Sequence, residues 1–278
     1  MLVAVLAVVV IVLVVLAFQR TRGGAPVEQS PRPIPSFSPT PDVTPSPTAT
    51  PAALPIAAPG AEERFLSVGS GALWRATAGA CGETAPLLER STDDGRTWND
   101  VTPRYLGIGQ ILSLNAFAGT EAQLVALMGA DCEVQGLRTF TQGRFWEPND
   151  DVLAGATYVL PDGAEVVTPS GSVETPCTHA WGARAVAGTV GLICDGTAFV
   201  REGSAWEPAG RDVVAIAASA DGLGTAALDG DCDGLMVTAE ATPVCVASAA
   251  SARPAAITLS GTDILLWAGD TITREPAP

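Results

Sequence analysis

The hydrophobic and polar positions divide the chain into three stretches of different pattern. Residues Met1 to Phe18 form one uninterrupted apolar run. As a helix this run is roughly 27 Å long, enough to cross the hydrocarbon core of a membrane. A cleaved signal peptide is the alternative, but its apolar core is usually shorter and ends in a small-residue cleavage site, which Ala17-Phe18-Gln19-Arg20 does not provide. We therefore expect residues 1–19 to be a transmembrane signal anchor.

The second stretch, residues 20–60, has no hydrophobic periodicity and is rich in proline. Residues 23–60 hold 11 of the 22 prolines, together with four serines and four threonines. Such a composition buries too little apolar surface to offset the entropy of ordering, so we expect a disordered, extended linker. Serine and threonine beside proline are also typical of O-glycosylated stalks, and the sequence alone does not separate a stalk from a plain linker.

The charges beside the apolar run argue against an extracellular location of the C-terminal domain. Arg20 and Arg22 follow the run, and the positive-inside rule then places the C-terminal bulk in the cytoplasm. The cysteines and the linker favour the outside instead. Our hypothesis is that Met1 lies downstream of the true start and that a basic leader precedes it; an in-frame stop upstream would exclude this. We expect a single-pass protein of the cell membrane with its C-terminal domain extracellular.

In the third stretch, residues 61–278, helical periodicity is weak and the apolar positions come in short runs. Glycine, aspartate, proline and serine interrupt these runs about every 8–12 residues, a spacing that predicts an all-β domain of many short strands. The clearest expected strands are 123–128, 157–160, 165–168, 189–193, 213–218 and 263–267.

A repeat runs through this stretch. The signal Gly-x-x-Trp occurs three times, ending at Trp98, Trp146 and Trp206. Each copy lies downstream of an apolar strand that ends in a cysteine, and a fourth such strand lacks the tryptophan; these cysteines are Cys81, Cys132, Cys194 and Cys232. Periods of roughly 40–60 residues with several strands each predict a β-propeller. We expect five or six blades, near 64–103, 107–149, 153–177, 178–209, 211–248 and 253–276, with the first and last segments as candidates to complete one another.

The first copy of the repeat is complete. Residues 91–98 read Ser-Thr-Asp-Asp-Gly-Arg-Thr-Trp and fit the pattern S-x-D-x-G-x-T-W. Here the sequence resembles the Asp-box, or BNR-repeat, β-propellers, a group that includes sialidases and photosystem-assembly-factor-like proteins. The resemblance implies a tight turn between the outer two strands of a blade, away from any catalytic centre. Its expected structural residues are Ser91, Asp93, Gly95, Thr97 and Trp98.

Charge and composition exclude several kinds of chemistry. All 15 basic residues are arginines, against 30 acidic residues, for a net charge of −15. Glu28, Asp42 and three arginines lie before residue 61, so residues 61–278 hold 28 acids and 12 bases, a charge of −16. Without lysine there is no phosphate loop and no Schiff base, and so acidic a domain is a poor nucleic-acid binder. The single histidine, His179, excludes a multi-histidine metal site and is expected to be structural or exposed.

Outside the cell, six cysteines suggest three disulfides. Cys81 and Cys132 occupy the same repeat position in adjacent blades. The other cysteines flank two expected hairpins, one between Cys177 and Cys194 and one between Cys232 and Cys245. We predict these three pairs, with buried free thiols as the alternative.

One acidic loop matches a calcium-binding pattern. Asp229, Asp231 and Asp233 with Glu240 satisfy D-x-D-x-D-G-x5-E, whose carboxylates can converge on Ca²⁺. No amphipathic helices flank the loop, and Cys232 lies inside it. A solvated acidic turn is the alternative, and we expect no other cofactor.

The leading functional prediction is a non-enzymatic binding or scaffold module, monomeric, for an envelope protein or glycan. The alternative is a sialidase-like glycoside hydrolase. Sialidase chemistry needs a tyrosine nucleophile, acidic residues and an arginine triad, and only Tyr105 and Tyr158 are available. The early arginine motif of sialidases is missing, and the charge of −16 disfavours an anionic sugar. We assign no catalytic residue. Three further tryptophans could stack on a sugar or fill the gaps between blades: Trp74, Trp181 and Trp267.

Overall fold

The described part of the chain consists of six antiparallel β-sheets. The computed structural model describes residues 56–220, 222–239, 242–247 and 253–276. The predicted anchor, residues 1–19, and the predicted linker up to residue 55 lie outside the described residues. Within the described part, no helix combines the length and the apolar character that crossing a membrane requires.

Each sheet is formed by consecutive strands. Blade 1 consists of β1 (Arg64–Gly69), β2 (Ala72–Thr77), β3 (Leu87–Ser91) and β4 (Asn99–Asp100), and blade 2 of β5 (Ile108–Ala116), β6 (Ala122–Met128), β7 (Glu133–Thr139) and β8 (Glu147–Pro148). Blade 3 has three strands, β9 (Tyr158–Val159), β10 (Glu165–Thr168) and β11 (Gly171–Glu174).

The second half of the ring repeats this order. Blade 4 consists of β12 (Trp181–Val186), β13 (Thr189–Cys194), β14 (Thr197–Glu202) and β15 (Ala205–Gly210), and blade 5 of β16 (Val213–Ser219), β17 (Gly222–Ala227), β18 (Gly234–Ala239) and β19 (Thr242–Ala247). Blade 6 again has three strands, β20 (Ala255–Ser260), β21 (Asp263–Ala268) and β22 (Thr271–Pro276).

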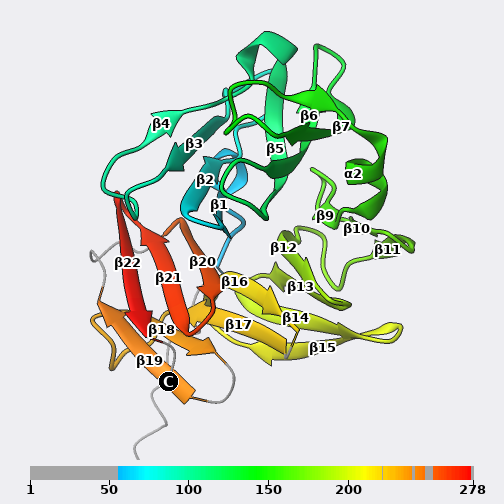
Figure 1. Cartoon of the computed structure of the whole chain (residues 1–278). Helices are drawn as coiled ribbons and strands as arrows, with labels where there is room; N and C mark the ends of the chain where they lie inside the picture. Colours follow the sequence, from blue (N-terminus) through cyan, green and yellow to red (C-terminus); the bar gives the residue numbers. More distant parts are fainter. Residues whose placement is uncertain (1–55, 221, 240–241, 248–252, 277–278) are drawn as a thin grey trace, which may run out of the picture. The chain divides into compact units, whose positions relative to one another are not determined.

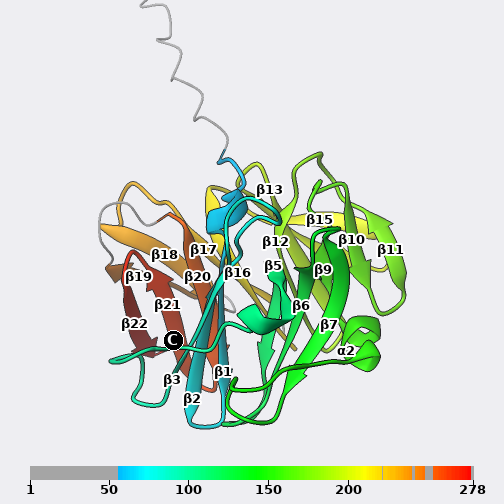
Figure 2. The ribbon, with the colours of Figure 1, turned by 90° about the horizontal axis from the view of Figure 1, so that it is seen from above.

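The six sheets close into a ring, which confirms a six-bladed β-propeller. The first strands of successive blades are neighbours around a central axis, in the order β1, β5, β9, β12, β16, β20 and back to β1. Figure 1 looks along this axis, and Figure 2 shows the ring from the side. The six predicted blade segments coincide with the six sheets, and the third and last are the short ones.

The ring closes by side-chain packing, without exchange of strands. Blade 1 takes all four of its strands from residues 64–100, so the first and last segments do not complete one another. Instead, Trp267 of blade 6 contacts two arginines of blade 1: the guanidinium carbons of Arg64 and Arg75 are 4.2 and 5.0 Å from its ring centre. Arg75 also lies over Trp98, at 4.1 Å. Two arginines and two tryptophans thus meet at the seam, and each cation faces an aromatic ring.

The segment before β1 is part of the propeller. Ile56 is buried among apolar residues of blades 5 and 6. A Cβ atom at Gly196 of blade 4 would lie only 3.0 Å from the side chain of Ile56, so this glycine leaves room for it. The chain then passes through the short 3-10 helix η1 (Gly60–Glu62) into β1. The packed domain thus includes Ile56, upstream of the domain start expected at residue 61.

Two ends of the ring can be distinguished. We call the end where the inner strands of blades 1, 2, 4, 5 and 6 begin the connector end, and the opposite end, where their first hairpins turn, the hairpin end. Residues 56–63 approach at the connector end (Figure 2). There the carboxylate of Glu63 accepts a hydrogen bond from the backbone N–H of Gly182 at 3.1 Å, which joins the start of blade 1 to the start of blade 4.

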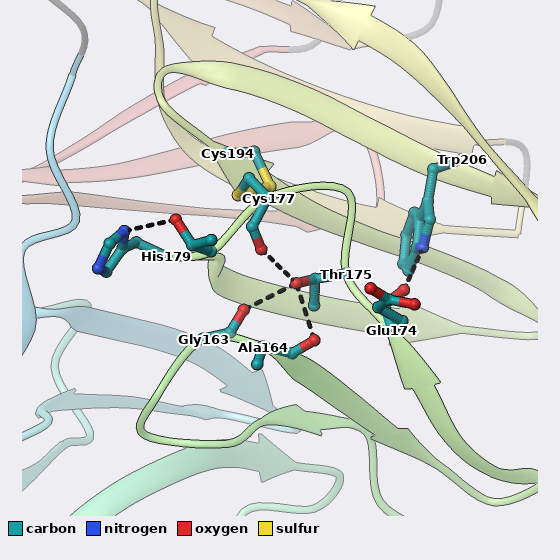
Figure 3. Close-up of a disulfide and its surroundings, with 9 residues drawn as sticks. Gly163, Ala164, Glu174, Thr175, Cys177, His179, Cys194 and Trp206 are labelled. Atoms are coloured by element: carbon teal, nitrogen blue, oxygen red, sulfur yellow. Dashed lines mark hydrogen bonds between the residues drawn. A yellow bond between two sulfur atoms is a disulfide. The ribbon is translucent and has the colours of Figure 1, made fainter.

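Three disulfides fasten the connector end and confirm the predicted pairs. Cys81–Cys132 joins blade 1 to blade 2, Cys177–Cys194 joins the connection before blade 4 to β13, and Cys232–Cys245 closes the β18–β19 hairpin. Beside the second of these, the buried hydroxyl of Thr175 lies 2.6–3.0 Å from the carbonyls of Gly163, Ala164 and Cys177 (Figure 3). In the described part of the chain no cysteine is free.

Candidate functional site: the central cavity and its rim

A central cavity opens along the propeller axis. Its volume is about 240 Å³, and every blade contributes to its wall. The wall includes, in order around the ring, Ser67, Asn115, Thr157, Arg184, Ala217 and Thr258, of which Thr157 lies directly before the first strand of blade 3. Because these residues mostly lie in the later parts of their inner strands, the cavity occupies the hairpin half of the axis, away from residues 56–63.

Helix α2 (Asp150–Gly155) forms one side of this wall. The helix stands between blades 2 and 3 and packs against β6 and β7. Its N-cap is Asn149, whose side-chain oxygen accepts a hydrogen bond from the backbone N–H of Val152 at 2.9 Å. Asp150 and Asp151 in the first turn complement the helix dipole. The capping motif thus places an exposed carboxylate, Asp151, at the cavity.

Arg184 is the positively charged residue of the cavity wall. Its two terminal nitrogens donate to the backbone carbonyls of Ala183 at 2.9 Å and Arg64 at 3.0 Å, and Glu63 lies 4.0 Å away. The side chains of Arg184 and Glu63 are only 20% and 19% exposed. Burial lowers the pKa of Arg184 and raises the pKa of Glu63. Arg184 thus ties blade 4 to blade 1, and its hydrogen-bonding capacity is largely used within the protein.

The cavity does not bring together the residues of a sialidase. Among the residues that line it, Asp151 and Arg184 are the ionisable ones, and neither tyrosine is present. Tyr158 is buried in the interior beside blade 2, and burial raises the pKa of its hydroxyl. The hydroxyl of Tyr105 bonds the backbone of Trp146 at 2.5 and 3.2 Å. Both predicted candidates for a nucleophile therefore lie outside the cavity.

Exposed aromatic residues stand beside the cavity on blade 2. Phe117, in the β5–β6 turn, is 41% exposed, and Phe140, directly after β7, is 49% exposed. The guanidinium carbon of Arg138 lies 5.2 Å from the ring centre of Phe117 and 4.3 Å from that of Phe140. Phe145, which is 69% exposed, lies in the same β7–β8 turn as Phe140. We call Phe117, Arg138, Phe140 and Phe145 the blade 2 rim.

Sequence reasoning missed the blade 2 rim. Its phenylalanines follow β5 and β7, which are not among the strands that the hydrophobic pattern identified, and a single exposed phenylalanine in a turn is not a distinctive signal. The nearest signal in the sequence is the polar residue Asn115, two positions before Phe117 at the end of a strand. The structure places Asn115 in the wall of the cavity. The pairing of β5 with β6 matches Asn115 with Gln123 and Ala116 with Ala122. Only this register shows that the turn lies at the mouth of the cavity.

The turn at residues 91–98 lies between β3 and β4 at the hairpin end. The hydroxyl of Ser91 accepts hydrogen bonds from the backbone N–H groups of Gly95 at 2.9 Å and Asp93 at 3.3 Å. Asp93 accepts from the backbone N–H of Thr97 at 2.9 Å and from its hydroxyl at 2.6 Å. These bonds hold the pKa of Asp93 near 2. Gly95 has φ +82°, and the indole N–H of Trp98 donates to its carbonyl at 3.0 Å.

Blade 2 contains a second turn of the same construction at residues 139–146. The hydroxyl of Thr139 takes the place of Ser91 and accepts from the N–H of Gly143 at 3.2 Å. The hydroxyl of Thr141 takes the place of the aspartate and accepts from the N–H of Phe145 at 2.9 Å. The indole of Trp146 donates to the carbonyl of Gly143 at 3.0 Å. Aligning T-x-T-x-G-x-F-W with S-x-D-x-G-x-T-W could have identified these threonines.

The third Gly-x-x-Trp copy is not equivalent to the first two. Gly203 and Ser204 form a tight turn between Glu202 and Ala205, so Trp206 lies within strand β15. Its indole donates to the carbonyl of Glu174 in blade 3 at 3.0 Å (Figure 3). The tryptophan thus bridges two blades, which its spacing from the glycine did not reveal.

The remaining tryptophans are interior residues. Trp74 is fully buried and meets Trp146 edge to face, with ring centres 6.2 Å apart, across the interface of blades 1 and 2. Trp181 and Trp267 are 7% and 6% exposed. All three fill space between strands, so they offer no stacking platform for a sugar. His179 is exposed, and its Nδ1 lies 3.0 Å from the hydroxyl of Thr178.

The predicted calcium loop is described only in part. The carboxylate of Asp229 accepts a hydrogen bond from the N–H of Asp231 at 2.8 Å, and Cys232 is held in its disulfide. Glu240, the twelfth position of the loop, lies outside the described residues. Among the residues that are described, no group of three or more histidine, cysteine or acidic side chains is placed to hold a metal ion. Calcium binding by Asp229, Asp231, Asp233 and Glu240 stays a prediction.

Comparison with known proteins gives distant structural likenesses. No family model and no curated protein matches the sequence. A solved structure of YCF48 bound to a D1 peptide is 14% identical, with 77% of this chain and 76% of that chain covered and a TM-score of 0.40. YCF48 from Cyanidioschyzon merolae is 17% identical, with coverages of 76% and 71% and a TM-score of 0.26. These values are too low to transfer a residue or a ligand to this chain.

Proposed function

We propose that this chain is a membrane-anchored, extracellular β-propeller that acts as a non-enzymatic binding module for an envelope protein. The contact surface is the hairpin end, formed by the central cavity and the blade 2 rim. One observation carries the proposal: Phe117 and Phe140, which are 41% and 49% exposed, both contact Arg138 at the end of the ring where the central cavity lies. Exposed aromatic residues next to arginine are enriched where proteins bind proteins.

The size and chemistry of the cavity support a protein partner. At about 240 Å³ the cavity is smaller than the roughly 300–1,000 Å³ typical of sites that enclose a small ligand. Its wall carries hydroxyl and amide groups, such as Ser113, Asn115 and Thr258, that can bond a peptide backbone or a side-chain tip. We infer that the partner lies across the rim and inserts one side chain into the cavity.

The two turns at residues 91–98 and 139–146 support a relationship to the Asp-box propellers. We infer that both are Asp-box turns, since both place side-chain oxygen acceptors at the same positions and share the same indole-to-carbonyl bond. The acceptors are a hydroxyl and a carboxylate in the first turn and two hydroxyls in the second. In this chain they stand at the same end of the ring as the cavity. They stiffen the strands that present the rim, because Phe140 and Phe145 belong to the second turn.

Co-purification of the full-length protein with chemically cross-linked membranes tests the proposal. A variant with Phe117→Ser and Phe140→Ser should lose the partner that the wild-type chain captures. A matched variant at the connector end, Thr178→Ala and His179→Ser, should keep it. Equal capture by all three chains, with unchanged melting temperatures, would exclude the rim as the contact surface. Release of a fluorogenic sialoside by the purified protein would instead indicate a hydrolase.

A further inference from the structure

The central cavity is bounded on its connector side by Arg184, which spans the propeller axis. Blade 4 lies opposite blade 1 in the ring of six. A terminal nitrogen of Arg184, in blade 4, donates across this distance to the carbonyl of Arg64, the first residue of β1, at 3.0 Å. Because β1 begins at the connector end, the bond crosses the axis on that side of the cavity. A side chain of a partner therefore enters from the hairpin end.

The positive charge of Arg184 is already offset within the protein. The carboxylate of Glu63 lies 4.0 Å from one of its terminal nitrogens, and two backbone carbonyls accept its hydrogen bonds. Arg138 of the blade 2 rim is offset in the same way, since its terminal nitrogen lies 3.4 Å from the carboxylate of Glu121. These two arginines therefore leave little positive charge for a partner at this end of the ring.

Asp151 is the carboxylate of the cavity wall, and it has no such counter-charge. The residue is exposed, and helix α2 lies at the end of the ring opposite to residues 56–63 (Figure 2). Among the residues that the structure describes, no arginine forms an ion pair with Asp151. The cavity thus presents a negative charge on the side from which a partner approaches. The charge of −16 on residues 61–278 strengthens the attraction for a cation.

The polar groups of the wall suit a cation that carries several donors. Asn115, Gln123 and Thr157 line the cavity together with Asp151. Their side-chain oxygens accept no hydrogen bond from another described residue. With the carboxylate, they offer more acceptors than the three N–H donors of an ammonium group can use, whereas a guanidinium carries five. A guanidinium is also planar and more weakly hydrated, which lowers the cost of entering a partly closed site.

We propose that the side chain which the partner inserts into the cavity is an arginine. Its guanidinium pairs with Asp151 and donates its remaining N–H groups to the polar wall. The phenylalanines of the blade 2 rim then contact the partner beside this arginine. This assignment rests on the proposed function and deepens it, since it names the chemistry that the hairpin end recognises.

Binding of small arginine analogues to the full-length protein in detergent tests the cavity without the partner. The probes are N-acetyl-arginine amide and N-acetyl-citrulline amide, which has nearly the same shape but carries no charge. Saturation-transfer NMR measures their dissociation constants for the wild type, Asp151→Asn and Asp150→Asn. Asp150 is the matched control, because it is also exposed in the first turn of α2 but does not line the cavity.

We expect the wild-type and Asp150→Asn chains to bind the arginine probe about fivefold more tightly than the citrulline probe, as for a partly exposed ion pair. Asp151→Asn should lose this preference, and added salt should weaken it in the other two chains. Equal binding of the two probes by the wild type, or an unchanged preference in Asp151→Asn, would overturn the proposal. An equal loss in both variants would also overturn it, because the general charge of the propeller would then explain the preference.

Capture of the partner from cross-linked membranes separates this proposal from the proposed function. Asp151→Asn should capture less of the partner than the wild type and Asp150→Asn. If Phe117→Ser with Phe140→Ser abolishes capture while Asp151→Asn leaves it unchanged, the rim binds the partner and the arginine assignment is wrong. If neither change affects capture, the hairpin end is not the contact surface, and the proposed function fails together with the arginine assignment.

Discussion

At the scale of single residues, short polar side chains stabilise the turns that present the rim. Ser91 and Asp93 in blade 1, and Thr139 and Thr141 in blade 2, satisfy backbone N–H groups that a tight turn leaves without partners. Two hydroxyls thus reproduce what a hydroxyl and a carboxylate do in the neighbouring blade. Because a threonine hydroxyl does not titrate, the two turns should respond differently to acid.

Asp93 should make the stability of the propeller depend on pH. Its pKa is about 2 in the folded protein, below the ordinary 3.8, because the bonds from Thr97 and Ser91 favour the charged form. A depressed pKa contributes stability that is fully present above about pH 4 and is lost as the pH falls through 2. Thermal melts of the wild-type and Asp93→Asn chains should therefore differ most near neutral pH and converge only below about pH 2.

The matched control is Asp131→Asn, another exposed acid in a loop at the opposite end of the ring. Its melting temperature should follow that of the wild type across the same range. A gap between wild type and Asp93→Asn that stays constant from pH 6 to pH 2 would show that the carboxylate does not act through its charge.

At the scale of elements, the sequence pattern is a good guide to strands and a poor guide to the site. The expected strand at 165–168 is β10 as observed, and those at 213–218 and 263–267 lie within β16 and β21. The three cysteine pairs also follow from repeat positions and hairpins. Short apolar runs between turns are enough for this, because each strand is defined locally.

The cavity could not be inferred in the same way. Arg184 contacts Arg64, 120 positions away, and no local pattern links them. Helix α2 was also missed, although Asn149 followed by two aspartates is a helix-start signal. The third Gly-x-x-Trp copy was a misleading signal, because the same spacing of glycine and tryptophan occurs in two kinds of turn. Features that depend on contacts between blades can be identified only from the structure of the closed ring.

The disulfides should differ in their contribution to stability according to the loops they close. Cys81–Cys132 spans 51 residues, and Cys232–Cys245 spans 13. A chain-entropy model gives about 4 kcal/mol for the longer loop and about 3 kcal/mol for the shorter one. Replacing Cys81 and Cys132 by alanine should therefore lower the free energy of unfolding more than replacing Cys232 and Cys245, as measured by denaturant titration. The reverse order would indicate that local packing outweighs chain entropy.

At the scale of the whole molecule, the propeller is a ring that is cross-linked by disulfides at one end and carries a cavity at the other. The connector end carries three disulfides and the packed segment 56–63, whereas the hairpin end carries the cavity and the exposed phenylalanines. Function in such frames resides on the loops of a rigid scaffold. At the interface between blades 1 and 6, the ring is held closed by side-chain contacts alone.

Trp267 should therefore be a critical residue for ring closure. Its side chain is 6% exposed, packs with Leu66, Leu73 and Leu265, and contacts Arg64 and Arg75. Replacing a buried tryptophan by alanine costs about 3–5 kcal/mol. Denaturant unfolding of Trp267→Ala should show a loss in this range, and Trp206→Ala, which removes a half-buried ring, should lose less. Equal losses would show that the seam is no more sensitive than an ordinary blade interface.

Site-specific photo-cross-linking in intact cells tests the central claim most directly. A photoreactive phenylalanine analogue is placed at Phe145 on the blade 2 rim or at His179 at the connector end, both of them exposed. We expect one discrete cross-linked protein from position 145 and none from position 179, with loss of the product when Phe117 and Phe140 are replaced by serine. A product from position 179 alone, or none from either position, would contradict the assignment of the hairpin end as the binding surface.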